Sequence, residues 1–318
     1  MDQKQTEKKE TITNRSVPLK INSLHIQIKV EHSNIDKNIE RINVSLANYS
    51  KKNKLDFVIF PEMALTGYNF FDKEHVRPLA EKQGKGKIFQ FAQSVALRLN
   101  SYVVIGYPEI YVNKKNKDDE QFYNSAYIVD RKGNLVQNIR KKHLYCTDKT
   151  WAQEGQEFQA VELVNHEGVY FKTGVGICMD INEKDFNNGG QFEWADFLKE
   201  QNVDVAILIQ NWVDSDPDRD DSVAVDGLLN YFLWRLRPLI NQKKNIIYDK
   251  QWLFLTSNVV GSEQNVLYEE GSDDYGKKEK NTTFCGLSAS IKINPETELI
   301  YVLEKKKEGI LFSQAKLE

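Results

Sequence analysis

The 318-residue chain is poor in the residues that build disulfides, metal sites and membrane spans. It has five histidines and only three cysteines, Cys146, Cys178 and Cys285. No two cysteines form a C-x-x-C pair and the histidines lack ligand-like spacing, so we expect free thiols, no metal and no cofactor. No apolar run approaches the roughly 20 residues of a membrane helix, and the first residues lack the apolar stretch of a signal peptide. These absences predict a cytoplasmic protein, with the nucleus as an alternative compartment.

The chain also lacks a large excess of charge of one sign. The chain has 43 Lys and Arg against 46 Asp and Glu, a formal net charge of -3. This near-balance gives no electrostatic basis for binding nucleic acid or an anionic membrane. What the chain has in plenty is apolar and aromatic bulk, with 16 Phe, 14 Tyr and 5 Trp, which is enough to fill a sizeable core.

Apolar segments with the period of strands alternate with segments that have the period of helices. This pattern predicts one α/β domain over residues 18–318 with mixed sheets, after a flexible polar tail over residues 1–17. Helical patterns cover residues 35–46, 88–99, 192–199 and 227–240. Strand patterns cover residues 24–30, 57–60, 102–107, 126–129, 135–142, 170–177 and 205–209, and strands over 252–257, 287–293 and 299–303 are expected to close the chain. Two charged segments, 113–121 and 269–281, are expected to be exposed insertions.

Three reactive side chains stand at or near the end of an apolar strand, where α/β proteins commonly bind ligands. They are Glu62, a lysine at position 141 or 142, and Cys178. Each alone is commonplace, because a cysteine after a strand is usually a core residue and a lysine in a basic cluster is usually solvated. Together they form a coherent set. A carboxylate can take the thiol proton, and an ammonium with a backbone N–H can hold the oxyanion formed by attack on an amide.

The three segments match known motifs. P-E-x-x-L-T-G-Y is matched from Pro61 to Tyr68, R-K-x-H-L-[FY] from Arg140 to Tyr145, and G-x-x-x-C-x-D from Gly174 to Asp180. In this order they resemble the Glu-Lys-Cys signature of the carbon-nitrogen hydrolase (nitrilase) superfamily. The resemblance covers nearly the whole chain and implies a four-layer α-β-β-α sandwich, with a homo-oligomer as the usual assembly.

The resemblance also implies a role for each residue. Glu62 is the general base, Cys178 the nucleophile and Lys141 the oxyanion stabiliser, and the backbone N–H of Met179 completes the oxyanion hole. Lys141 is chosen over Lys142 because the motif places its lysine two residues before the histidine. Strand alternation also puts it on the face of the residues at 139 and 143.

Further segments resemble one branch of the superfamily, the protein N-terminal asparagine/glutamine amidohydrolases. They are residues 144–151, 176–182, 211–213, 231–239 and 257–263. The chain departs from the branch at Glu183, where proline is usual, at Val259, where arginine is usual, and over 187–191. The branch implies a polypeptide substrate with N-terminal Asn or Gln, which is converted to Asp or Glu with release of ammonia. In the N-degron pathway such a product is primed for arginylation and degradation.

The substrate pocket is less defined by the sequence. The α-ammonium group of the substrate needs an anion in the pocket, for which Asp180 and Glu154 are candidates. Asp180 also suits a cap on the following segment. Glu154 is the expected second active-site carboxylate, with Asp148 as the alternative. Trp212 suits the pocket wall or the core equally. Cys146 and Cys285 are expected to be packing residues, and Lys305–Lys307 a solvated run. Two other functions stay open, a small-molecule amidase acting on an ω-amide or pantetheine-like amide, and a non-catalytic scaffold.

Overall fold

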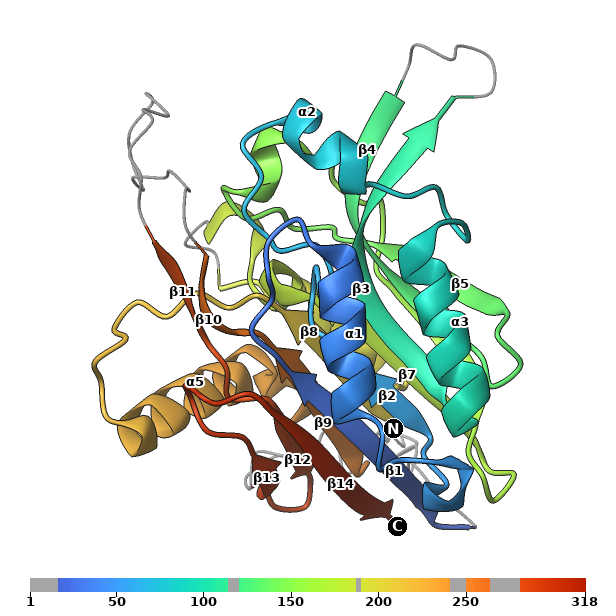
Figure 1. Cartoon of the computed structure of the whole chain (residues 1–318). Coiled ribbons are helices and arrows are strands. Elements are labelled where there is room, and N and C mark those ends of the chain that lie inside the picture. Colours follow the sequence, from blue (N-terminus) through green and yellow to red (C-terminus); the bar gives the residue numbers. More distant parts are fainter. Residues whose placement is uncertain (1–16, 114–119, 187–189, 241–249, 264–280) are drawn as a thin grey trace, which may run out of the picture.

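The computed structural model describes residues 17–113, 120–186, 190–240, 250–263 and 281–318 (Figure 1). The predicted tail, apart from its last residue, lies outside the described residues, as does most of each predicted insertion. The described strands form two six-stranded sheets and a two-stranded ribbon of β10 (Val260–Glu263) and β11 (Thr282–Cys285).

The first sheet combines strands of the N-terminal half with the last strand of the chain. Its order is β14 (Gly309–Leu317), β1 (Leu19–Gln27), β2 (Phe57–Ile59), β3 (Tyr102–Val112), β4 (Glu120–Val129) and β5 (Leu135–Arg140). β1, β2 and β3 are parallel, and the remaining pairings are antiparallel. The hairpin between β4 and β5 turns at Asp130, whose Oδ1 accepts the backbone N–H groups of Lys132 and Asn134, each at 2.8 Å.

The second sheet has the same mixed construction. Its order is β13 (Glu298–Val302), β12 (Ala289–Ile293), β9 (Trp252–Asn258), β8 (Val205–Gln210), β7 (Tyr170–Ile177) and β6 (Gln159–Val164). β7, β8 and β9 are parallel at its centre. In each sheet the parallel strands therefore end at one common edge, and segments that follow them can bring side chains together.

Three hydrophobic layers separate four layers of secondary structure. The first lies between the first sheet and helices α1 (Ile35–Ser45) and α3 (Lys87–Leu99). The second lies between the two sheets, and the third lies between the second sheet and helices α4 (Glu193–Glu200) and α5 (Asp221–Arg235). The short helix α2 (Lys73–Val76) follows β2 along the chain. The structure thus confirms the predicted four-layer α-β-β-α sandwich.

The layers explain why β2 is wholly apolar. Phe57 and Ile59 face the layer between the sheets, whereas Val58 faces the helices. A strand that is covered on both sides has no polar face, which is the pattern the sequence shows at residues 57–60. β8 likewise has one face toward the layer between the sheets and the other toward the layer beneath helices α4 and α5.

Several predicted boundaries differ from the structure, and two differences concern the C-terminal part of the chain. The chain does not close with the strand at 299–303, because β14 follows and pairs with β1 along all of its residues. Its inward positions include Ser313 and Ala315, which carry little apolar signal. The helix predicted over 227–240 begins earlier, at Asp221, since the side chain of Asp220 accepts the N–H of Ser222.

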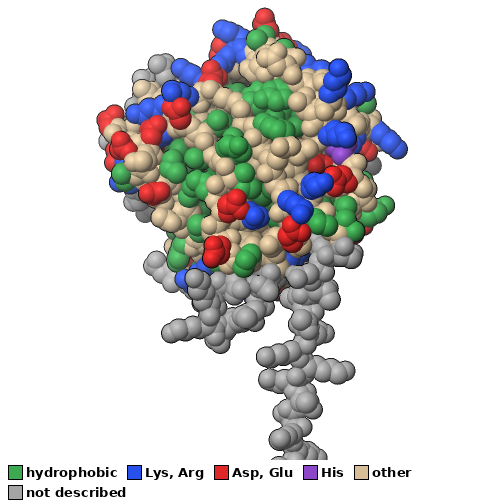
Figure 2. Space-filling model, turned by 90° about the horizontal axis from the view of Figure 1, so that it is seen from below, with side chains coloured by type: hydrophobic (Ala, Val, Ile, Leu, Met, Phe, Trp, Pro, Cys, Tyr) green, Lys and Arg blue, Asp and Glu red, His purple; other side chains and the backbone are tan. Residues whose placement is uncertain are grey.

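The surface agrees with the near-balance of charge. On the face shown in Figure 2, Lys and Arg side chains lie among Asp and Glu side chains, with hydrophobic side chains between them. Among the described residues, no helix is both long enough and apolar enough to cross a membrane.

Candidate active site

The three predicted catalytic side chains follow three strands of the two facing sheets. Glu62 comes after β2, Lys141 directly after β5, and Cys178 directly after β7. The alternation expected around Lys141 holds, because Lys141 is fully buried while Lys142 is partly exposed. Gly106 in β3 lets the Glu62 segment approach, since a Cβ atom there would lie 2.6 Å from the Glu62 Cα atom.

Glu62 is fully buried, and both of its carboxylate oxygens accept hydrogen bonds. Its Oε1 accepts from Lys141 Nζ at 2.7 Å and from Asn124 Nδ2 at 2.6 Å, and its Oε2 accepts from the backbone N–H of Asn211 at 2.8 Å. Burial raises the pKa of Glu62 above its usual value, and the charge of Lys141 only partly opposes this. A carboxylate with a raised pKa is better matched to accept a proton near neutral pH.

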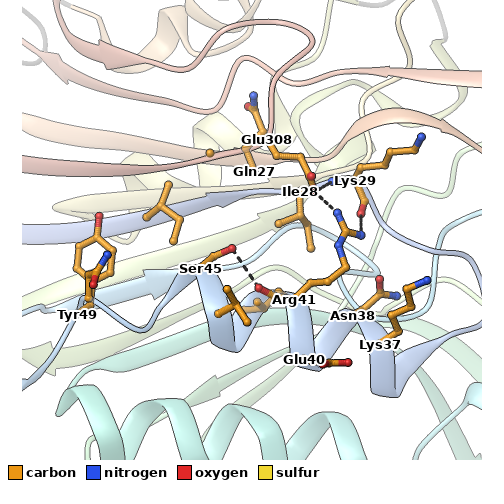
Figure 3. A pocket seen from close by; sticks show the side chains of 15 residues that line it. Gln27, Ile28, Lys29, Lys37, Asn38, Glu40, Arg41, Ser45, Tyr49 and Glu308 are labelled. Carbon is orange, nitrogen blue, oxygen red and sulfur yellow. Dashed lines mark hydrogen bonds and ion pairs between the residues drawn. The ribbon is translucent and has the colours of Figure 1, made fainter.

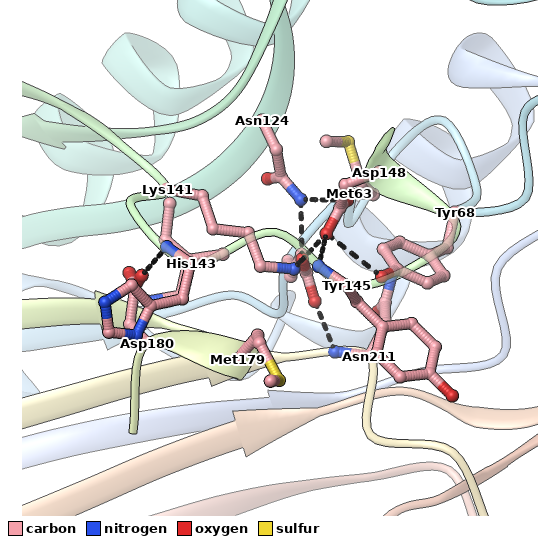
Figure 4. A network of polar contacts seen from close by, with 12 residues as sticks. Met63, Tyr68, Asn124, Lys141, His143, Tyr145, Asp148, Met179, Asp180 and Asn211 are labelled. Atoms are coloured by element: carbon pink, nitrogen blue, oxygen red, sulfur yellow. Dashed lines mark hydrogen bonds and ion pairs between the residues drawn. The ribbon is translucent and has the colours of Figure 1, made fainter. Parts of the chain in front are cut away.

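Asp148 is the second carboxylate beside Lys141. Its Oδ2 accepts from Lys141 Nζ at 2.6 Å and from the backbone N–H of Tyr145 at 2.9 Å, and its Oδ1 accepts from Asn124 Nδ2 at 2.9 Å. Figure 4 shows Lys141, Asn124 and Asp148 pointing toward one another. Burial lowers the pKa of Lys141, but the charges of Asp148 and Glu62 outweigh it and raise the pKa overall, so the side chain stays an ammonium.

Cys178 stands at a sharp turn from β7 into a 3₁₀ turn, Cys178–Ile181. Its φ of 45° lies in the left-handed region, which non-glycine residues rarely occupy. The side chain is 8% exposed, so the thiol is buried but reaches a cavity. Burial and the charge of Glu62 raise its pKa well above the usual value, while Lys141 and the N–H of Asn211 lower it. The thiol is therefore neutral at rest and needs a base.

Asp180 fixes the nucleophile turn to the Lys141 segment. Its Oδ2 accepts the backbone N–H of Ile177 at 2.8 Å, and its Oδ1 accepts those of Lys142 and His143, each at 2.9 Å. Both oxygens are thus occupied by backbone donors on the two segments that carry Cys178 and Lys141. These contacts favour a positioning role for Asp180 over substrate binding, and they differ from the expected cap, because the backbone groups bound precede Asp180 in the chain.

Glu154 is not in the site. Its side chain, 42% exposed, pairs with Lys184 at 2.7 Å on the surface. The Asp148–Thr150 3₁₀ turn follows the lysine segment immediately and keeps Asp148 inside, whereas Glu154 lies beyond the turn. The structure therefore places Asp148, the alternative, beside Lys141.

The cavity at Cys178 has a volume of about 160 Å³. Met179 and Trp212 line it, as do Tyr68, Tyr145, Asn182, Phe186, Asn211 and Val213. Trp212 also packs at right angles to Phe232, with ring centroids 5.2 Å apart, so it belongs to both the pocket wall and the core. Within the described residues, no group of three or more His, Cys, Asp or Glu side chains is arranged to hold a metal ion.

A larger cavity, of about 730 Å³, lies away from this chemistry, between α1 and the start of β14 (Figure 3). Arg41 crosses it, donating to Glu308 Oε1 at 2.6 Å and to the carbonyl of Lys29 at 2.7 Å. Its cation is thus already paired, and none of the lining residues is a cysteine.

Comparison with known proteins identifies the family. The model of the carbon-nitrogen hydrolase family matches residues 25–184. This match covers half of the chain and includes the three segments that carry Glu62, Lys141 and Cys178. The chain belongs to the carbon-nitrogen hydrolase family.

Two fungal relatives carry the same name. The protein N-terminal amidase of Saccharomyces cerevisiae is 31% identical over 217 residues, which are 63% of this chain and 46% of that protein. The chain therefore spans less than half the length of that relative. The protein N-terminal amidase of Schizosaccharomyces pombe is 28% identical over 297 residues, 88% of this chain and 94% of that protein. A crystal structure of an N-terminal amidase with an Asn-Glu-Ala peptide has a TM-score of 0.75 at 20% identity, covering 94% of this chain and 98% of that one, which establishes a common fold.

Sequence reasoning missed two site residues of this carbon-nitrogen hydrolase. Asn124 on β4 bridges Glu62 and Asp148, and the backbone of Asn211 after β8 binds Glu62. Asn124 carried no signal, because a polar residue within a strand also suits an exposed face. Asn211 stands in the segment 211–213 that resembles the branch, but it was given no role, although the strand-end argument applies to it as well.

Proposed function

We propose that the protein is an amidohydrolase that converts N-terminal Asn or Gln of polypeptides to Asp or Glu, releasing ammonia. The observation that carries the chemistry is the buried network of Glu62, Lys141 and Asp148, placed close enough to Cys178 for its charges to shift the thiol pKa. Membership of the carbon-nitrogen hydrolase family supports amide hydrolysis, and the two fungal N-terminal amidases support the substrate class.

In the first half of the proposed reaction, Glu62 takes the proton of Cys178 and the thiolate attacks the side-chain carboxamide. The ammonium of Lys141 donates one hydrogen bond to Glu62 and one to Asp148, which leaves its third N–H for the developing oxyanion. The backbone N–H of Met179, next to the nucleophile, is the second donor. Glu62 then passes this proton to the leaving nitrogen. The C–N bond breaks, ammonia departs, and a thioester on Cys178 remains.

In the second half, water attacks the thioester carbonyl and gives its proton to Glu62. The C–S bond breaks, the thiolate takes the proton back, and the carboxylic acid product leaves. Each half uses the same base and the same oxyanion donors. The reaction consumes one water and needs no redox partner.

The cavities support a substrate that continues beyond its first residue. The cavity of about 160 Å³ at Cys178 has the size of one small side chain, and a second of about 310 Å³ shares Trp212 and Val213 as lining residues. The second is lined by Asp214, Ser215 and Arg219 among others. We assign the first cavity to the N-terminal side chain and the second to the residues that follow.

A peptide panel tests this function. Peptides that differ only in their first residue, Asn, Gln, Asp or Ala, are incubated with the protein and analysed by mass spectrometry. We expect a mass increase of about 1 Da, the change from amide to acid, for Asn and Gln alone. Deamidation of internal Asn at the same rate, or no conversion at all, would overturn the proposal.

A small-molecule amidase is the second candidate. The 2-oxoglutaramate amidase of Bacillus subtilis is 27% identical over 158 residues, and the 160 Å³ cavity is large enough for a short ω-amide. Ammonia release from free ω-amides and free glutamine, measured beside the peptides, separates the two functions. A higher kcat/KM for a free ω-amide than for every peptide would favour this candidate. A thiol-labelling assay on Cys178 with substrate protection, read together with ammonia release, tests the scaffold without activity.

A further inference from the structure

Asn211 binds Glu62 and lines the same cavity as Cys178. It follows β8, and its backbone N–H donates to Glu62 Oε2 at 2.8 Å while also lowering the pKa of the Cys178 thiol. Figure 4 shows Asn211 beside the buried polar network. The residue is held there by its backbone, so its side chain is not needed to position Glu62.

The side-chain amide of Asn211 has no internal task in the described structure. The residue is 2% exposed and lines the cavity with Cys178, yet its Oδ1 has no hydrogen-bond partner among the described residues. A buried amide without a partner is costly, which points to a ligand group that completes it.

Asn182 in the same cavity provides a contrast. Its Nδ2 donates to Met179 Sδ at 3.2 Å, and its Oδ1 accepts from the hydroxyl of Tyr231. The cavity thus holds two asparagines, one engaged within the protein and one not. The difference assigns a substrate contact to Asn211 alone.

We propose that Asn211 is a specificity-determining residue whose Oδ1 accepts an N–H of the substrate carboxamide. This inference rests on the proposed function. A primary carboxamide offers two acceptor lone pairs on oxygen and two N–H donors on nitrogen. Lys141 and the N–H of Met179 serve the oxygen, whereas Glu62 and Asn211 serve the nitrogen. A half-turn of the terminal amide of Asn211 interchanges the positions of its oxygen and nitrogen. The oxygen can therefore turn toward the substrate while the backbone stays in place.

This pairing favours the amide over the product acid. The product carboxylate carries no N–H, and it would bring its charge toward the Asn211 oxygen and Glu62. A site that hydrogen-bonds a substrate N–H rejects analogues that lack it, because its own acceptor is then left unpaired. Asn211 therefore helps to bind the carboxamide and to release the acid.

The test compares an amide with an ester that lacks the N–H groups. Peptides beginning with Asn or with aspartate β-methyl ester give the same thioester on Cys178, releasing ammonia or methanol. Their kcat/KM values report this first half-reaction. In Asn211→Ala we expect kcat/KM for the amide to fall about 10- to 100-fold and for the ester about threefold or less. Ester turnover also shows that the variant is folded.

Two further variants define the contact. Asn211→Asp keeps acceptors but no donor, so its amide-to-ester ratio should stay near that of the wild type even if both rates fall. Asn182→Ala is the matched control, and its ratio should also be unchanged. An equal fall for amide and ester in Asn211→Ala, or a ratio in Asn211→Asp as low as in Asn211→Ala, would overturn the inference. Absence of wild-type turnover of Asn peptides would instead overturn the proposed function, and the inference with it.

Discussion

Two regions of the molecule place a buried cysteine beside a buried lysine and a carboxylate. Around Cys178, Lys141 lies between Glu62 and Asp148. Around Cys285, Lys305 pairs with Asp214 at 2.9 Å and donates to the carbonyl of Asp216 at 2.7 Å. Both lysines are at most 1% exposed.

The difference lies in charge balance and in what the sulfur contacts. The Cys285 region has one carboxylate for one ammonium, and Cys285 Sγ accepts from Asn258 Nδ2 at 3.2 Å. The Cys178 region has one carboxylate more than it has cations, whereas a cavity adjoins both cysteines. A paired lysine stabilises a buried acid, whereas an excess carboxylate beside a thiol provides a base.

The largest expected effect separates the two cysteines. Cys178→Ala should reduce ammonia release from an Asn-initiated peptide by about 10⁴-fold or more, because the covalent step is lost. Cys285→Ala should keep activity within about threefold, since it removes only one buried sulfur. Steady-state ammonia assays on both variants, with circular dichroism as the folding control, measure this. Comparable losses in both would remove the distinction between the regions.

The second prediction concerns the two lysines. Lys141→Met removes the oxyanion donor and should lower kcat by about 10²- to 10³-fold. It also leaves buried carboxylates unpaired, as Lys305→Met does, so each variant should lose about 3–5 kcal/mol of unfolding free energy. Urea denaturation and peptide kinetics separate the two effects. If Lys305→Met lowered kcat as much as Lys141→Met, the special role of Lys141 would be lost.

The sequence predicted the reacting groups better than their surroundings. Glu62, Lys141 and Cys178 were found because short motifs fix them at strand ends. Glu154 was preferred to Asp148 because spacing alone cannot show which residue stays inside after a 3₁₀ turn.

The sequence also carried no sign of the second region, the one around Cys285. Lys305 begins a run of three lysines that was predicted to be solvated, yet it is 1% exposed and ion-paired with Asp214, distant in the chain. Only the folded structure brings such partners together. β14 was likewise found through its pairing with β1, because two of its four buried positions, Ser313 and Ala315, carry little apolar signal.

The third prediction changes the charge balance itself. Asp148→Asn leaves Lys141 with one carboxylate, as in the Cys285 region. Because the charge of Asp148 raises the pKa of both Glu62 and Cys178, its removal should lower both. The acid limb of the kcat/KM profile should therefore move to lower pH, and thiol alkylation should begin at lower pH. We expect kcat to fall about 10- to 100-fold, since Lys141 is less firmly held. An acid limb that moved to higher pH would contradict this account.

The smallest expected effect concerns a buried carboxylate that has no lysine partner within the described part of the chain. Glu263 is buried, and among the residues that the structure describes its oxygens accept only the backbone N–H groups of Tyr68 and Asn69, at 3.0 to 3.1 Å. Burial raises its pKa to about 7 from 4.5. The folded state thus binds its proton more tightly than the unfolded state does. This contribution to stability is fully present below about pH 4.5 and is lost as pH rises through about 7.

Glu263→Gln should remove that dependence, because its amide keeps one acceptor and does not titrate. Thermal melting temperatures of the two proteins, measured from pH 5 to pH 8, should therefore converge or cross as pH rises, with the wild type falling faster. The expected difference is a few degrees across this range. Parallel curves would mean that Glu263 is ionised throughout, held by its two backbone donors as firmly as the lysine-paired carboxylates are held by theirs.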